Sequence, residues 1–148
     1  MIGLTFRETM SGGYHLATSP GEDRPMHFTV QARLPSLRSL LTNAVFSIDG
    51  EVHAPGFADH KVLHGTLVID MLRGKVLVYQ FDFEANDGQT YSYNGRKTIG
   101  EGSLVEAMTV LPGTIHDKTG ETVGRALLRF DLRSDLFKFL SSYKLVRT

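Results

Sequence analysis

Two ionisable residues stand at positions where the sequence predicts inward-facing side chains. Glu8 falls in register with apolar residues of its strand, and Lys97 falls in register with Tyr91, Tyr93 and Gly95. Alternate residues of a strand face opposite sides, so both charges are expected on the inner face. A lone buried charge is costly, which leaves two interpretations: the residues pair with each other, or each lies at a strand end and reaches solvent. A pair would supply an acid and a base, or would fix the polar end of an apolar ligand.

Three tyrosines lie near this predicted face. Tyr79, Tyr91 and Tyr93 could present their hydroxyls to a ligand, or could be ordinary core and rim residues with one satisfied hydroxyl each. Glu8 and Lys97 are therefore the catalytic candidates. The same two residues and the three tyrosines are the candidates for ligand binding.

The histidines suggest a metal site only weakly. His53, His60 and His64 follow the spacing H-x6-H-x3-H, with Asp49 and Glu51 just upstream. Asp49, Glu51 and His53 share a strand parity, so they could converge. The spacing matches neither HExxH nor the His and Glu pattern of metal-binding double-stranded barrels. We expect solvent-facing histidines on a loop-like segment and no metal.

The sequence lacks the residues and motifs of several other catalytic mechanisms. The chain has no Cys, which excludes thiol nucleophiles, disulfides and thiolate metal sites. There is no G-x-S-x-G elbow for a serine hydrolase. The glycine-rich MSGG and GEGS lack the context of a phosphate loop and are expected to be turns. No cofactor is expected.

The elements that would position these residues are strands. The segment from Lys61 to Ile99 predicts an antiparallel meander of long strands with two tight turns, and the strand 75–85 is apolar on both parities at its start. The three strands of the meander are predicted at 61–72, 75–85 and 90–99. Arg73-Gly74 forms the turn between the first two strands, and residues 86–88 form the turn between the second and the third.

The rest of the chain continues this pattern. Further strands are predicted at 2–10, 26–34, 44–53 and 122–132, and an apolar run within 103–116 is expected to end at Pro112-Gly113. Residues 11–25, 54–60 and 118–121 are expected to be connections, 35–41 and 134–143 short helices, and 144–148 a last strand. Seven to nine strands with short connections predict one all-β domain over residues 1–148. We favour a closed antiparallel barrel, lipocalin-like or allene-oxide-cyclase-like, because closure removes exposed strand edges.

Composition narrows the class of partner. The 148 residues carry 16 basic and 16 acidic side chains, so the formal net charge is zero. This balance disfavours nucleic-acid binding and favours self-association into a homo-oligomer. No apolar run approaches the ~20 residues of a membrane-spanning helix, and the first residues show no secretory pattern. A cytoplasmic protein is therefore expected.

Short motifs along most of the chain resemble a family. The chain is similar to the small β-barrel accessory domain fused to cholesterol-oxidase-like flavoproteins of the GMC oxidoreductase type. The opening matches at Phe6, Glu8, Met10 and Gly12, and the centre at Gly50, Val52 and Gly65; the most specific stretch matches at Tyr79, Phe83, Asp87-Gly88, Gly95 and Lys97, and the closing LLRFDLRSDLFKFL also fits.

The resemblance implies an accessory role near lipid or sterol chemistry. It implies no flavin site, because the nucleotide-binding fingerprint is absent and the chain is too short for that fold. A flavoprotein oxidoreductase would then be a partner on a separate chain.

Three functions follow as hypotheses. The first is binding of a small, mostly apolar molecule such as a lipid, sterol or polyketide-like compound in a barrel cavity. The second is a cofactor-free isomerase or cyclase that uses Glu8 or Lys97 as a proton shuttle in the same cavity. The third is a non-catalytic interaction subunit of an oxidoreductase, with a filled core.

Overall fold

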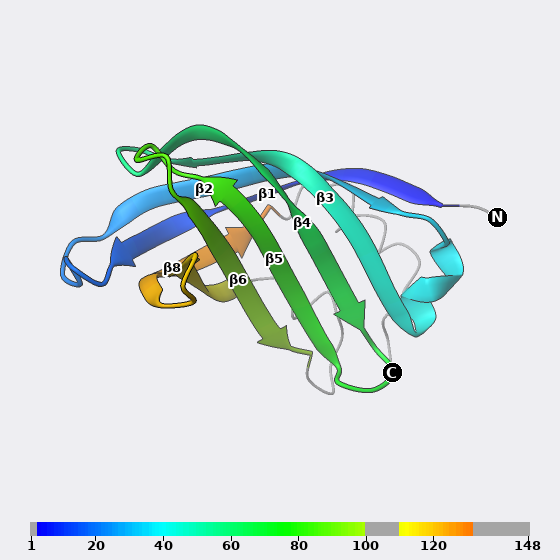
Figure 1. Ribbon diagram of the computed structural model, residues 1–148. Helices are drawn as coiled ribbons and strands as arrows, with labels where there is room; N and C mark the ends of the chain where they lie inside the picture. Colours follow the sequence, from blue (N-terminus) through cyan, green and yellow to red (C-terminus); the bar gives the residue numbers. More distant parts are fainter. Residues whose placement is uncertain (1–2, 100–109, 132–148) are drawn as a thin grey trace.

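The computed structural model is a closed antiparallel barrel of eight strands (Figure 1). It describes residues 3–99 and 110–131. Each strand pairs with the next along the chain, and β8 pairs with β1 to close the wall. The elements are β1 (Leu4–Leu16), β2 (Arg24–Leu34), the 3-10 helix η1 (Leu37–Leu41), β3 (Asn43–Ala54), β4 (Ala58–Asp70), β5 (Val76–Glu84), β6 (Thr90–Thr98), β7 (Val110–Asp117) and β8 (Thr122–Phe130).

Alternation of apolar and polar residues builds this wall. In β2 every second side chain from Met26 to Leu34 is buried, and in β5 the same holds from Leu77 to Phe83. The inward residues fill the barrel and the outward ones meet solvent, as a closed sheet requires. The predicted all-β barrel with a short helix is confirmed. The helix and strand predicted at 134–143 and 144–148 lie outside the described residues.

The first predicted loop is largely wrong. Residues 11–16 continue strand β1, and the connection to β2 is confined to 17–23. The glycine pair that suggested a turn serves the closure of the barrel instead. A Cβ atom on Gly12 would lie 2.2 Å from the Leu127 carbonyl oxygen, so only glycine fits between β1 and β8 there.

Two other predicted breaks also fall inside strands. β4 begins at Ala58, so the connection predicted at 54–60 shortens to a tight turn around Gly56, whose φ is +87°. Pro112 and Gly113 lie within β7 rather than ending it. Pro112 faces outward, just past the last β6–β7 pair, Gly95–Gly113. A proline needs no ladder hydrogen bond at such a position.

The core is a set of stacked and edge-on aromatic rings. Phe28 lies at its centre, with ring centroids 5.4 Å from Tyr79, 5.0 Å from Phe81 and 5.8 Å from Tyr93. All four side chains are 0% exposed. Rings at these separations and tilts pack favourably beyond the area that they bury.

The two ends of the barrel differ. At the end that we call the hairpin end, four short connections meet: 17–23, 55–57, 85–89 and 118–121. At the opposite end, β1 begins and η1 follows β2 (Figure 1). Within the described ranges, no helix has the length and apolar character needed to traverse a bilayer.

Candidate functional site

Three of the predicted site residues lie inside the barrel. Glu8 is 1% exposed, and Tyr79 and Tyr93 are 0% exposed. Burial raises the pKa of Tyr79 well above its ordinary value, and the nearby Glu8 and Tyr93 raise this pKa further. Burial alone raises the pKa of Tyr93. Glu8 therefore faces the interior, as its strand parity indicated.

Tyr93 occupies a space that two glycines create. Gly95 and Gly113 face each other across β6 and β7. A Cβ atom on Gly113 would lie 2.6 Å from the Tyr93 hydroxyl, and one on Gly95 would lie 2.7 Å from the same atom. The phenol ring therefore lies flat across both glycines. No sequence pattern could have indicated this contact, because Gly113 is remote from Tyr93 in the chain.

The hydroxyls of Tyr79 and Tyr93 have no hydrogen-bond partner in the described part of the chain. A buried polar group without a partner costs about 1–3 kcal/mol. Most buried side-chain hydroxyls in native proteins therefore meet protein or water. The two hydroxyls are therefore polar groups inside a core that is otherwise mainly apolar.

We expect alkaline pH to destabilise the protein through these tyrosines. Their folded-state pKa values lie above the unfolded value of about 10, so the unfolded chain loses its protons first. Stability is complete below pH 10 and falls above it, by about 1.4 kcal/mol per tyrosine at pH 11. Urea unfolding at pH 8 and pH 11 measures this loss. Tyr79→Phe and Tyr93→Phe should each reduce it, and an unchanged loss in the double variant would contradict the assignment.

Lys97 does not join this interior group. Its Nζ donates a hydrogen bond of 2.9 Å to the carbonyl oxygen of Val110. The ion pairs within the described residues do not include one between Glu8 and Lys97. The side chain is half-buried and bridges β6 and β7 beyond the last backbone pair of these strands. We infer a structural role for it at that point.

Lys97→Met should lower the free energy of unfolding by about 1–3 kcal/mol, because it removes a charge-assisted hydrogen bond while keeping the aliphatic stem. Chemical denaturation measures the change. Arg96→Met is the matched control: Arg96 is adjacent and exposed, so we expect a change within about 0.5 kcal/mol. Equal effects of the two substitutions would mean that the Val110 contact contributes nothing.

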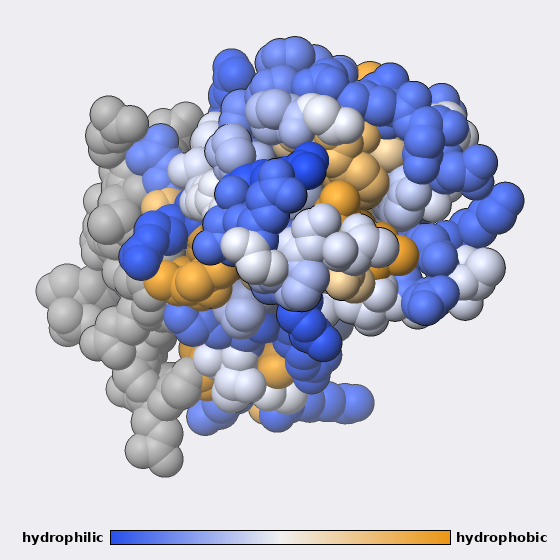
Figure 2. Space-filling model, turned by 90° about the vertical axis from the view of Figure 1, so that its left-hand side faces the viewer, coloured by the Kyte–Doolittle hydropathy of each residue, from blue (hydrophilic) through white to orange (hydrophobic). Residues whose placement is uncertain are grey.

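Tyr91 lies at the hairpin end and lines an open hollow there. The hollow has a volume of about 470 Å³ and sits between all four connections of that end. Figure 2 looks onto this end and shows apolar surface at its centre, bordered by hydrophilic side chains. The lining residues, from β1 round to β8, are Leu16, Ala17, Thr18, Phe57, Asp87, Tyr91, Glu121, Thr122 and Val123. We call this feature the mouth hollow.

Aromatic rings form one wall of the mouth hollow. The Phe57 ring lies 5.0 Å from Tyr91 and 6.0 Å from Phe83, edge-on to both, and Tyr91 stacks on Phe83 at 6.1 Å. Phe57 comes from the β3–β4 turn and Tyr91 from the start of β6. Turn and strand residues from separate hairpins thus converge here. Phe57 was absent from the sequence prediction because a turn residue carries no parity signal.

Polar groups fix the position of Tyr91. Its hydroxyl donates a 2.7 Å hydrogen bond to Asp87 Oδ2, and the Gln89 amide donates a 2.8 Å bond to Asp87 Oδ1. These two bonds lower the pKa of Asp87, so it is ionised at neutral pH. The bond to Asp87 also raises the pKa of Tyr91. The predicted ligand-facing tyrosine is therefore held in place beside a carboxylate.

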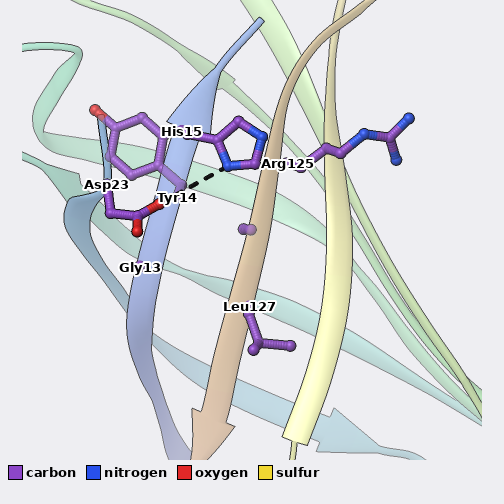
Figure 3. A pocket seen from close by; sticks show the side chains of 7 residues that line it. Gly13, Tyr14, His15, Asp23, Arg125 and Leu127 are labelled. Atoms are coloured by element: carbon purple, nitrogen blue, oxygen red, sulfur yellow. Dashed lines mark ion pairs between the residues drawn. The ribbon is translucent and has the colours of Figure 1, made fainter. Parts of the chain in front are cut away.

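A second hollow, of about 460 Å³, lies on β1 and β8 beside the β1–β2 connection (Figure 3). His15 Nδ1 lies 4.0 Å from Asp23 Oδ1, and the Arg125 side chain extends away from this pair. Leu127, 52% exposed, lines the same hollow. Its polar groups do not converge on a common point, and it offers no catalytic geometry.

The candidate metal residues form pairs on the outer wall. His60 bonds Glu51 and His64 bonds Asp49, each through Nδ1 at 2.5 Å. The His53 and His60 rings stack with centroids 3.8 Å apart. Among the described residues, no group of three or more His, Asp or Glu side chains could hold a metal ion. The histidines lie on two paired strands, which corrects the expectation of a loop-like segment.

Comparison with protein-family models, curated proteins and solved structures gives no match.

Proposed function

We propose that this barrel binds a small, mostly apolar molecule in the mouth hollow. The observation that carries the proposal is the hollow itself: about 470 Å³, with Phe57, Tyr91 and aliphatic side chains on its walls. Ligand pockets typically measure about 300–1,000 Å³, are mainly apolar, and contain a few fixed polar groups. The mouth of a β-barrel is a common place for them.

The mouth hollow fits this role better than the barrel interior. Below it, the rings of Phe28, Phe81 and Tyr93 are fully buried and in mutual contact. A ligand in the described interior would have to displace them. The mouth hollow is open and needs no such displacement. The first sequence hypothesis is therefore retained, with its site moved from the interior to the hairpin end.

A substitution that fills the hollow tests the proposal. Ala17 is an exposed lining residue, and its backbone amide keeps a 2.8 Å hydrogen bond to Val123 whatever its side chain. Ala17→Trp should weaken binding of Nile red, a neutral apolar fluorescent dye, by at least about tenfold, since the indole then occupies space in the hollow that the dye needs. Fluorescence titration measures the dissociation constant, and thermal unfolding confirms that the variant is folded.

Gln89→Trp provides the matched control. Gln89 is exposed in the β5–β6 connection at the same end but does not line the mouth hollow. We expect its Nile red affinity to equal that of the unmodified protein. If Ala17→Trp and the unmodified protein bound Nile red with equal affinity, the dye would bind elsewhere and the proposal would be wrong. Native mass spectrometry of protein taken gently from the producing cell then identifies a natural small molecule.

The isomerase or cyclase hypothesis depends on Glu8. This carboxyl group is buried close to Tyr79, an environment in which an acid or base could act on a substrate. A substrate that entered through the mouth hollow would need to reach it past the central rings. Turnover of any bound molecule that disappears in Glu8→Gln while binding persists would favour the enzyme. A flavoprotein that co-purifies with the barrel would favour the interaction-subunit hypothesis instead.

A further inference from the structure

We infer that the mouth hollow selects molecules that carry a protonated amine on an apolar body. The inference rests on the proposed function and adds the charge of the ligand to it. It depends on three features of the hollow: its carboxylates, its aromatic wall, and the positions of the nearby cations.

Two carboxylates belong to the lining. Asp87 belongs to the β5–β6 turn and Glu121 to the β7–β8 turn, so two neighbouring hairpins each contribute one acidic residue. Asp117, which ends β7, is close enough to Tyr91 to act on it electrostatically. Hydrogen bonds from Thr119 and from the Glu121 amide keep the Asp117 pKa low. The hollow therefore has Asp87 and Glu121 in its lining and Asp117 close to Tyr91.

The aromatic wall adds attraction for a cation. Phe57 and Tyr91 both line the hollow, and their rings meet edge to face at 67°. A ligand in the hollow would contact these two rings. A cation above an aromatic face gains about 0.5–1 kcal/mol at an exposed site. The apolar body of the ligand would pack against Leu16 and Val123 on the opposite strands.

Among the described residues, none of these carboxylates forms an ion pair with a Lys or Arg. The described lining residues include no Lys or Arg. Arg24, at the start of β2, lies 3.2 Å from Glu22 and acts on Tyr14. Lys118 is exposed in the β7–β8 turn and does not line the hollow. Asp87 accepts only neutral donors in the described structure, Tyr91 and Gln89. A ligand ammonium group would supply the missing positive charge.

Three probes with one indole body test the charge preference. Tryptamine carries an ammonium group, tryptophol a neutral hydroxyl, and indole-3-acetate a carboxylate. The chain contains no Trp, so indole fluorescence reports the probe alone. We expect tryptamine to bind about fivefold to tenfold more tightly than tryptophol at low salt, and indole-3-acetate to bind most weakly. The preference should shrink as salt screens the carboxylates.

Charge-neutral variants separate the inference from the proposed function. The double variant Asp87→Asn with Glu121→Gln keeps the side-chain shapes, and Asn suits the turn. Its single Oδ1 can accept the bond from the Gln89 amide, while its Nδ2 donates to the Tyr91 hydroxyl instead of accepting from it. The double variant should reduce the preference for tryptamine over tryptophol to the small part that the aromatic wall and Asp117 still contribute. Glu84→Gln, which removes an exposed carboxylate of β5 outside the hollow, should keep the preference.

Each outcome has one meaning. Tryptophol binding as tightly as tryptamine in the unmodified protein overturns the charge inference but leaves the apolar site. A tryptamine preference that is undiminished in the double variant places the cation elsewhere and also overturns the inference. Failure of all three indoles and of Nile red to bind removes the proposed function itself.

Discussion

Gly65→Ala is expected to lower the free energy of unfolding by about 3 kcal/mol, the upper end of ordinary overpacking penalties. A Cβ atom at this position would lie 1.9 Å from the Gln80 carbonyl oxygen and 2.5 Å from the Phe81 Cα atom. Both contacts are with backbone, which cannot rotate away as a side chain would. The β4–β5 ladder must open locally to admit the methyl group. Urea unfolding monitored by circular dichroism measures the change.

Other glycines of the chain provide a graded control. A Cβ atom on Gly124 would meet the His15 carbonyl oxygen at 3.0 Å, whereas one on Gly21 would meet nothing within 4 Å. We expect Gly124→Ala to fall between the other two, and Gly21→Ala to change stability by no more than about 0.5 kcal/mol. A Gly65→Ala protein as stable as Gly21→Ala would show that the strands can separate there at little cost.

The inward direction of side chains could be predicted from the sequence because a strand has a period of two. This rule placed Glu8 and Lys97 on the inner face, and both have that parity in the barrel. It also predicted the meander from 61 to 99, where each strand alternates and each turn contains Gly. The barrel follows from these local rules, since closing the sheet is the remaining way to satisfy its edges.

Depth along the barrel could not be predicted in the same way. Tyr91 and Tyr93 share a parity, yet Tyr93 is fully buried and Tyr91 lines the mouth hollow. Two residues of strand advance about 7 Å, enough to move from core to rim. Parity carries no information on which level of the barrel a residue occupies. The predicted ligand-binding set is therefore divided among the interior, the hairpin end and the far end of β6.

Glycine was misread because its two uses look alike in a sequence. At Gly88 and Gly120 it serves turns with positive φ, as the pattern predicted. At Gly12 and Gly113 it admits a neighbouring strand or ring, and those partners lie far away in the chain. The net charge of the chain also could not indicate the local charge of the mouth hollow. A net charge of zero is compatible with a hollow whose described lining includes two carboxylates and no basic residue.

Phe28→Ala is expected to have the largest effect of all, a loss of about 3–5 kcal/mol in the free energy of unfolding. Phe28 is fully buried and contacts the rings of Tyr79, Phe81 and Tyr93. Its removal leaves a cavity in the middle of the barrel that neighbouring strands cannot close. Thermal and urea unfolding measure the loss. Val62→Ala, at a position 64% exposed, should change stability by no more than about 0.5 kcal/mol.

The cavity in Phe28→Ala also shows how the described interior compares with the mouth hollow as a ligand site. A dry apolar cavity of this kind binds small apolar molecules. Toluene should therefore stabilise Phe28→Ala more than the unmodified protein, by about 1–3 kcal/mol when its concentration is well above the dissociation constant. In the unmodified protein, where Phe28 fills that space, any toluene effect should disappear with Ala17→Trp. Toluene stabilisation that survives Ala17→Trp would place a natural apolar cavity in the interior, and the first sequence hypothesis would return to its original location.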